Sequence, residues 1–304
     1  MIKEFKQAMM TEYEMTDLGL MRYFLGMQVK QKAGHIFIYQ EKYADDLLKK
    51  FRMTDCKPTS TPMGTNEKLS KEDGKEKVDE TIYRSLVGSL IYLTNTRPDI
   101  QHAVSIVSRF MSKPSKSHFT AAKRILRYVK GTKNFGIIYK AESDCDLIGY
   151  TDSDWAGSID DRKSTTGYIF LLGSKIISWA TKKQKTVALS SAEAEYMAAT
   201  SATCEAVWLR RIMENLHQRV DRPTKIYCDN MSTIAMTKNP VFHSRTKHIE
   251  IRHHFIRELV EQGEIELDFC RTKDQLADIF TKPITTEKFI KIRNMLGVTN
   301  FSRL

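Results

Sequence analysis

The feature that most constrains this chain is a short apolar strand that ends in two carboxylates and a glycine. It covers residues 148–157, with the sequence IGYTDSDWAG. Side chains alternate between the two faces of a strand, so Asp152 and Asp154 are expected on the same side. Two neighbouring carboxylates are costly unless a cation neutralises them, and hard oxygen ligands select Mg²⁺ or Mn²⁺ over zinc. The stretch therefore predicts a metal-binding strand end, with a solvated turn as the alternative.

The charge balance predicts a polyanionic partner. The 304 residues include 48 Lys plus Arg and 37 Asp plus Glu, a net charge of +11 that is typical of nucleic-acid-binding proteins. No stretch approaches the roughly 18 apolar residues of a membrane-spanning helix, and no apolar leader follows Met1. We therefore expect an intracellular protein, cytoplasmic or nuclear, that is neither secreted nor bound to a membrane. The five cysteines have no CxxC spacing, which argues against a disulfide framework or a zinc knuckle.

Residues 1–56 predict a β-hairpin followed by an amphipathic helix. The hairpin strands are expected at 23–29 and 35–39, and the helix at 40–51, where apolar residues recur every four positions. The helix contains the tetrapeptide YADD at 43–46, which resembles a polymerase active-site sequence. That active site needs a tight hairpin, whereas lysines one turn later suit ordinary pairs on a helix surface. We expect no polymerase catalysis from this tetrapeptide.

A flexible linker and a helical region are expected next. Residues 57–81 are rich in Lys, Glu, Ser, Thr and Pro and have few apolar side chains, which predicts a flexible linker. Residues 82–145 predict three helices, the last over 118–130. Lys123 and Arg127 lie on the basic side of that helix. This side either contacts a phosphate backbone or is simply solvated.

Residues 146–284 predict an α/β unit. The opening strand is followed by two more strands with short turns, which favours an antiparallel meander. Lys163 lies in the first turn, and Lys182 and Lys183 follow the third strand. These lysines form a candidate phosphate-binding surface, although a solvated loop would have the same sequence.

Three further carboxylates follow the meander. Glu195 heads an apolar stripe on a helix over 190–216, so it is expected to face the sheet and to need a cationic partner, unless it is a partly exposed first-turn glutamate. Asp229 follows a short buried strand, where by itself it suits a helix N-cap. Asp278 lies one turn into a helix that Asp274 is expected to cap. Residues beyond 284 are expected to form a C-terminal tail.

The order and spacing of these motifs resemble one family. The ribonuclease H domain of copia-type retrotransposon Pol polyproteins is similar at residues 150–157 (YTDSDWAG), 189–196 (LSSAEAEY), 228–230 (CDN) and 275–282 (QLADIFTK). Upstream, the part of the same polyproteins between the polymerase palm and that domain is similar at residues 23–26 (YFLG), 83–90 (YRSLVGSL), 96–100 (TRPDI) and 122–128 (AKRILRY). The resemblance covers nearly the whole chain.

The resemblance implies a fold class and an activity. The fold would be α/β, with a ribonuclease H-like five-stranded mixed sheet and flanking helices, preceded by a mostly helical remnant of the reverse transcriptase thumb and connection. The activity would be endonucleolytic cleavage of the RNA strand of an RNA/DNA hybrid, selected through the 2′-OH. Two Mg²⁺ ions roughly 4 Å apart, or Mn²⁺, would be the cofactor, with no small-molecule cofactor. The matching carboxylates are Asp152, Glu195, Asp229 and Asp278, with Asp154 as the alternative to Asp152.

The chain also departs from the family pattern. It lacks the Tyr-Val-Asp-Asp hairpin, the fingers and most of the palm, so reverse transcription by this chain alone is not expected. A second hypothesis is a decayed or co-opted remnant that binds nucleic acid without catalysis. A third is polymerase activity through Asp45 and Asp46, for which we expect no support. The sequence does not indicate an oligomeric state.

Overall fold

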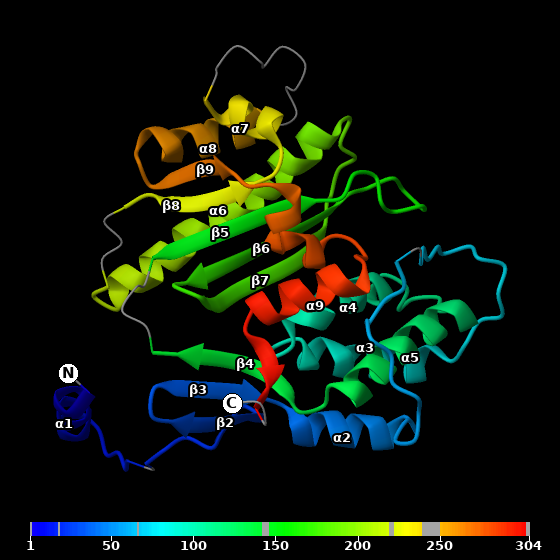
Figure 1. Ribbon diagram of the computed structural model, residues 1–304, viewed down its shortest axis with the longest axis horizontal. Coiled ribbons are helices and arrows are strands. Elements are labelled where there is room, and N and C mark those ends of the chain that lie inside the picture. Colours follow the sequence, from blue (N-terminus) through cyan, green and yellow to red (C-terminus); the bar gives the residue numbers. More distant parts are fainter. Residues whose placement is uncertain are drawn as a thin grey trace.

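The computed structural model contains two five-stranded sheets with helices packed around them (Figure 1). It describes residues 2–17, 19–65, 67–141, 146–218, 222–238 and 250–301. The upper sheet has the strand order β7-β6-β5-β8-β9. Its strands are β5 (Leu147–Ser153), β6 (Thr165–Leu172), β7 (Lys175–Lys183), β8 (Thr224–Cys228) and β9 (Ile265–Phe269).

The upper sheet is mixed, as the sequence predicts. Strands β5, β6 and β7 form the antiparallel meander, whereas β8 pairs parallel with both β5 and β9. Helix α6 (Ser191–Asn215) covers one face, and the 3-10 turn η5 (Leu276–Phe280) packs against β5 and β6. The remaining helices of this part are α7 (Met231–Lys238) and α8 (Glu250–Glu261). Helix α8 lies where the sequence predicts a helix over 246–262, and residues 246–249 of that stretch lie outside the described residues.

The lower sheet joins the beginning and the end of the chain. Its order is β1-β2-β3-β4-β10, all antiparallel. The residues expected to form a tail instead make helix α9 and strand β10, because Leu296 and Val298 are buried apolar residues. The elements are β1 (Tyr23–Phe24), β2 (Met27–Lys32), β3 (His35–Tyr39), β4 (Phe135–Lys140), α9 (Thr286–Met295) and β10 (Val298–Asn300).

The helical region lies between the two sheets and shares a core with both. Buried residues of its helices belong to one apolar cluster with Ile169 of β6, Phe280 of η5 and Val298 of β10. Packing is thus continuous across the expected domain boundaries. Its helices are α2 (Glu41–Lys50), α3 (Glu80–Leu93), the 3-10 turn η1 (Pro98–Ile100), α4 (Gln101–Ser108) and α5 (Lys116–Gly131), whereas no described side chain of α1 (Ile2–Glu12) belongs to this cluster.

The tetrapeptide at 43–46 lies inside α2, as the sequence predicts. Its charges are paired differently from the expected pairs on the helix surface. Asp45 forms an ion pair with Lys133, 3.0 Å away, and Lys50 donates a hydrogen bond to Ser85. These partners come from α3 and from the turn after α5, so the charges of α2 help to attach it to its neighbours.

The segment expected to be a flexible linker packs against α5. Thr61 and Pro62 are buried, and Met63 lies against the apolar core. Arg127 Nε donates to the carbonyl oxygen of Lys57 at 2.7 Å, and Arg124 donates to Thr61 Oγ1 at 3.2 Å. Side-chain hydrogen bonds from a helix therefore order this polar segment, an effect that its low apolar content does not reveal.

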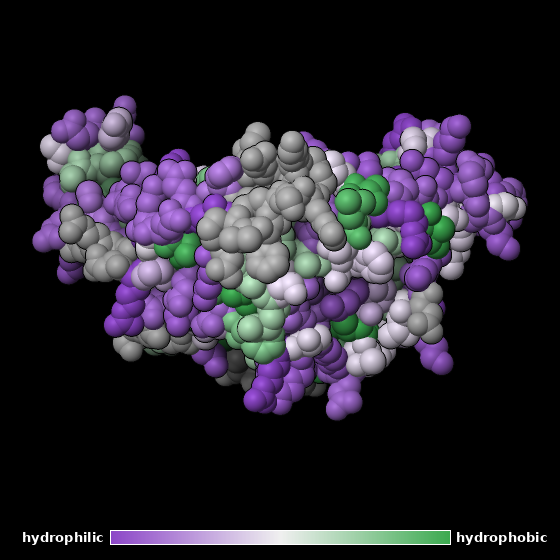
Figure 2. All heavy atoms as spheres, turned by 90° about the horizontal axis from the view of Figure 1, so that it is seen from above, coloured by the Kyte–Doolittle hydropathy of each residue, from purple (hydrophilic) through white to green (hydrophobic). Residues whose placement is uncertain are grey.

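The surface of the described part is mostly polar. Figure 2 shows the face seen from above, where hydrophilic residues predominate on both flanks and the apolar patches are small. Within the described residues, no helix is both long and apolar enough to cross a membrane.

Candidate metal centre

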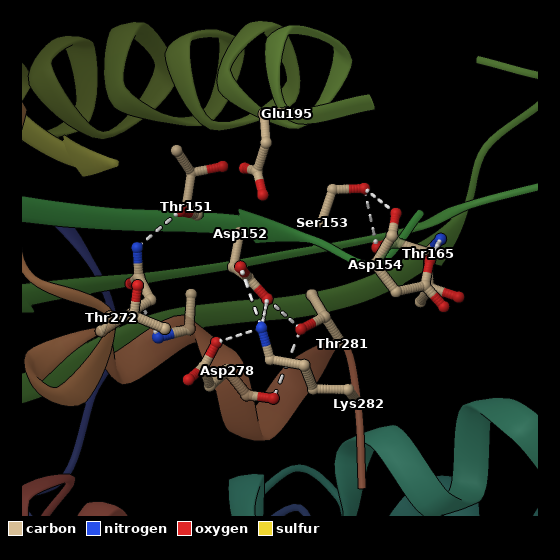
Figure 3. Close-up of polar contacts among 12 residues, drawn as sticks. Thr151, Asp152, Ser153, Asp154, Thr165, Glu195, Thr272, Asp278, Thr281 and Lys282 are labelled. Carbon is tan, nitrogen blue, oxygen red and sulfur yellow. Dashed lines mark hydrogen bonds and ion pairs between the residues drawn. The ribbon is translucent and has the colours of Figure 1, made fainter. Parts of the chain in front are cut away.

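Asp152 lies at the carboxyl end of β5 and is buried. Its side chain lies on the side of the strand that faces η5, where Thr281 Oγ1 donates a hydrogen bond to Oδ2 (Figure 3). Burial raises the pKa of Asp152 to about 6, against the lowering effect of the nearby Lys282. A buried carboxylate whose pKa is raised in this way needs positive charge close to it in order to ionise.

Asp278 supplies the second carboxylate on this side, from η5, and it is fully buried. Lys282 lies between the two aspartates, with Nζ 2.6 Å from Asp278 Oδ1 and 3.4 Å from Asp152 Oδ2. Figure 3 shows its ammonium pointing at both. Although burial lowers it, the two carboxylates raise the pKa of Lys282 above its ordinary value. Lys288 binds the other oxygen of Asp278.

The element that carries Asp278 differs from the expected helix. Two short 3-10 turns, η4 (Thr272–Asp274) and η5, occupy this stretch, and the α-helix begins only at Thr286. Gln275, rather than the expected Asp274, accepts a hydrogen bond from the amide of Ala277 at 3.1 Å. Gln275 also donates to the carbonyl oxygen of Thr151 at 2.9 Å, which ties the turn to β5.

Glu195 approaches the same strand end from α6. Ser190 caps that helix by accepting a hydrogen bond from the amide of Glu193 at 3.2 Å. Glu195 is 6% exposed and accepts a hydrogen bond from the backbone of Ser153. Burial, followed by the charges of Asp152 and Asp229, raises its pKa to about 9. The predicted apolar stripe below it is buried at Ala199, Ala202, Ala206 and Leu209.

Asp229 follows β8 and completes the set. Asn230 Oδ1 accepts a hydrogen bond from the amide of Thr233 at 3.1 Å, so Asn230 takes the capping role considered for Asp229. Ligand atoms of Glu195, Cys228 and Asp229 all lie within 4.8 Å of one another. Cys228 Sγ is 4.0 Å from Glu195 Oε2. The thiol is a potential ligand that the sequence interpretation did not include.

Asp154 lies apart from this group. Strand β5 ends at Ser153, so the regular alternation of side chains stops before Asp154. Its Oδ1 accepts a hydrogen bond from the amide of Thr165, and Figure 3 shows the pair away from Lys282. Asp154 and Arg109 line a cavity of about 220 Å³ whose lining also includes Thr281 and Lys282. Burial raises the pKa of Asp154 to about 6.

The four expected carboxylates thus gather in two connected groups at one end of the sheet. We name Asp152 and Asp278 the bridged pair, because Lys282 joins them, and Glu195, Cys228 and Asp229 the thiol group. The charge of Asp229 acts on Asp152, and that of Asp152 on Glu195, so the groups are electrostatically coupled. Carboxylate oxygens gathered in this way suit a hard divalent cation such as Mg²⁺ or Mn²⁺.

The sequence offered one signal for Lys282. It lies four residues after Asp278, a spacing that brings a lysine to a carboxylate in helical geometry. Its contact with Asp152 joins residues 130 positions apart and has no such local signal. Cys228 lies next to Asp229, but the absence of CxxC spacing gives no signal that it could be a ligand.

The expected phosphate-binding residues have partners within the protein. Lys163 and Lys183 lie 3.8 Å and 2.7 Å from carboxylate oxygens of Asp161. Lys182 is exposed and sits over the Tyr168 ring, 5.5 Å from its centroid. On α5, Lys123 lies over the Phe119 ring at 4.7 Å, and Arg127 holds the segment at Lys57.

Comparison with known proteins places the chain in a family. A family model described as "Reverse transcriptase (RNA-dependent DNA polymerase)" matches residues 1–65. The Pol polyprotein of transposon RE1 from Arabidopsis thaliana is 44% identical over 94% of this chain and 20% of its own length. That of transposon TNT 1-94 from Nicotiana tabacum is 41% identical over 98% of this chain and 23% of its own length. The chain belongs to the copia-type retrotransposon Pol polyproteins.

The chain spans about a fifth of the length of these Pol polyproteins. Its first 65 residues match the reverse transcriptase model, and the similarity to the Pol polyproteins continues through nearly the whole chain. A shorter relative, the uncharacterized mitochondrial protein AtMg00810 of Arabidopsis thaliana, is 44% identical over 64% of this chain and 81% of its own length. The Pol family is therefore similar to this chain both upstream of the mixed sheet and within it.

Solved structures with related folds include ribonucleases H and a viral reverse transcriptase. LC11-RNase H1 in complex with RNA/DNA hybrid covers 45% of this chain and 94% of its own, with 12% identity and a TM-score of 0.35. The foamy viral protease-reverse transcriptase in complex with dsDNA covers 84% of this chain and 46% of its own, with 13% identity and a TM-score of 0.49.

Proposed function

We propose that this Pol region is a metal-dependent endonuclease that cleaves the RNA strand of RNA/DNA hybrids. One observation carries the proposal: Asp152, Glu195, Asp229 and Asp278 come from four separate elements and meet at one end of the mixed sheet. Such a cluster is costly to a fold without a cation, which favours a functional role for it. The similarity to Pol polyproteins supports a nucleic-acid-processing role for this region.

The residues have separate roles in the proposed reaction. When bound, a pair of divalent ions supplies an activated water and stabilises the leaving 3′ oxygen. Asp152 and Asp278 would hold one ion between β5 and η5, and Glu195 and Asp229 would hold the other from α6 and the end of β8. The Lys282 ammonium lies within ion-pair distance of both carboxylates of the bridged pair and offsets their mutual repulsion before metal enters. Contacts to the 2′-OH would select RNA over DNA.

The proposed substrate-binding surface is basic. Lys163, Lys182 and Lys183 lie on β7 and on the turn before β6, and we assign them contacts to the phosphate backbone. We assign the same kind of contact to Lys123 and Arg127 on α5. Each lysine or arginine that reaches a phosphate displaces a condensed counterion, so hybrid binding should weaken as salt rises.

The test is cleavage of an end-labelled RNA/DNA hybrid by the folded chain in Mg²⁺. We expect the RNA strand alone to be cut, and Asp229→Asn to abolish cutting. Asp268→Asn is the matched control, because Asp268 lies on neighbouring β9 and is half-exposed beside Lys225. Absence of cleavage by folded wild-type protein with saturating Mg²⁺ rejects the proposal.

A second candidate function is a nucleic-acid-binding remnant without catalysis. The position of Lys282 favours it, since this ammonium already neutralises Asp152 and Asp278 without metal. This alternative predicts hybrid binding that is sensitive to salt, independent of Mg²⁺ and unchanged in Asp229→Asn. Turnover of the labelled hybrid would exclude it.

A further inference from the structure

A second lysine holds Asp278 from the side opposite Lys282. Lys288, in the first turn of α9, binds Asp278 Oδ2, and the same ammonium donates to the carbonyl oxygen of Thr272 at 2.9 Å. The carboxylate is fully buried, whereas the Lys288 side chain is 26% exposed. Lys282 contacts the other oxygen, Oδ1. The two oxygens of Asp278 thus have different partners, one on each side.

Helix α9 is itself fixed by residues far upstream of the mixed sheet. Phe289 packs edge-on against the Tyr128 ring of α5, with centroids 5.6 Å apart. Arg293 donates to the Tyr128 hydroxyl at 3.2 Å, and that hydroxyl donates to Asp99 at 2.6 Å. Asp99 in turn forms a buried ion pair with Arg97 at 2.7 Å.

Strand β10 holds the other end of α9. It pairs with β4 in the lower sheet, where Val298 lies opposite Ile137. Figure 1 shows α9 running between the two sheets, close to η5. Lys288 is therefore presented to Asp278 by a helix whose position depends on the helical region and the lower sheet, outside the unit predicted at 146–284.

We infer that Lys288 is a positioning residue that fixes Asp278 Oδ2 so that Oδ1 faces the cation shared with Asp152. The inference rests on the proposed metal centre. Groups that hydrogen-bond a metal ligand from behind set its orientation, and their loss typically weakens metal binding or activity about 10- to 100-fold. Lys282 differs, because its ammonium lies between the two carboxylates rather than behind one of them.

The two lysines can be separated by measuring metal affinity in the full-length chain. Mn²⁺ binding is followed by electron paramagnetic resonance, without substrate. We expect Lys288→Met to bind Mn²⁺ about 10-fold more weakly than wild type or worse, and Lys288→Arg to recover most of the affinity. Lys291→Met is the matched control, because Lys291 lies one turn along on the exposed side of α9 and only reaches Asp274 at 4.0 Å.

The opposite result is equally informative. If Lys288 acted only as a repelling charge, Lys288→Met would bind Mn²⁺ as tightly as wild type or more tightly, and the inference would be overturned. Lys288→Gln, which keeps a hydrogen-bond donor, replaces the methionine variant if that protein does not fold, and we expect intermediate affinity. Failure of the proposed nuclease would look different: wild type would bind Mn²⁺ and leave the hybrid uncut.

Discussion

The bridged pair and the thiol group both bring acidic side chains together, but they differ in the positive charge that lies beside them. Lysines 282 and 288 contact the carboxylates of the bridged pair, and the pKa of Asp152 rises only to about 6. Within the part of the chain that the structure describes, no lysine or arginine forms an ion pair with Glu195, whose pKa rises to about 9. The thiol group therefore has the greater need for a metal, and the bridged pair is already assembled without one.

The largest expected effect is on hybrid cleavage, where substituting a residue of the two groups should cost much more than substituting Asp154. We expect Asp152→Asn to lower hybrid cleavage at least about 1000-fold, because loss of a metal-holding carboxylate removes several kcal/mol of transition-state stabilisation. Asp154→Asn, which changes the carboxyl bound to the Thr165 amide, should lower it less than about 10-fold. Single-turnover cleavage rates measure both. Equal losses would mean that Asp154 belongs to the site.

The next effect concerns stability without metal. The folded-state pKa of Glu195 is about 9 and its ordinary value is 4.5, so the protonated acid is preferred in the fold. Its contribution to stability is complete below pH 4.5 and is lost as pH rises through about 9. In EDTA at pH 8, Glu195→Gln should therefore raise the melting temperature by roughly 3–6 °C, on the order of 1–2 kcal/mol.

Thermal melts of Glu195→Gln with and without Mg²⁺ check this expectation. Saturating Mg²⁺ should reverse the order, since only the wild-type carboxylate binds the ion and gains stability from it. For Asp152 the pH range between the ordinary pKa of 3.8 and the folded-state pKa of about 6 is narrower. The gain in melting temperature of Asp152→Asn at pH 8 should therefore be smaller. A larger gain for Asp152→Asn would contradict the comparison between the two groups.

A smaller effect should distinguish the groups by their donor atoms. Cys228 gives the thiol group a soft sulfur ligand, whereas the bridged pair has oxygen donors. We expect Cd²⁺ to produce ultraviolet thiolate absorption that Cys228→Ser removes, together with about a 10-fold loss of Cd²⁺ affinity. Mn²⁺ affinity should change little. Unchanged Cd²⁺ absorption in Cys228→Ser, which leaves exposed Cys204 in place as an internal control, would exclude sulfur ligation here.

The smallest effect concerns single surface lysines. Lys182→Ala should weaken hybrid binding about threefold and lower the salt slope by about 1, as expected for one phosphate contact. Lys163 shares Asp161 with Lys183, so Lys163→Ala should have less effect. Binding titrations at several salt concentrations compare them. No change in slope for either variant would place the hybrid elsewhere on the protein.

Local pattern predicted most of the fold. Alternating residues marked the strands of the mixed sheet, and the apolar stripe below Glu195 fixed the face of α6. The resemblance then selected Asp152 over Asp154, a choice that the alternation alone left open. The end of β5 at Ser153 separates the two, and it depends on pairing with β6.

Long-range contacts were harder to predict. The segment over 57–81 has the composition of a linker, yet arginines of α5 hold it in place. The strand partner of the C-terminal residues could not be predicted from the sequence, because β10 pairs with β4, more than 150 positions earlier. The contacts of Lys282 with Asp152 and of Lys288 with Asp278 depend on tertiary packing that no local spacing specifies.

The pairing of β10 with β4 bears on how copies of such an element decay. A gene copy with a premature stop codon at residue 283, 284 or 285 would still encode all four acidic motifs. It would nevertheless lack Lys288 and the last strand of the lower sheet. Counting intact motifs in a genome would then overestimate how many copies encode a competent enzyme.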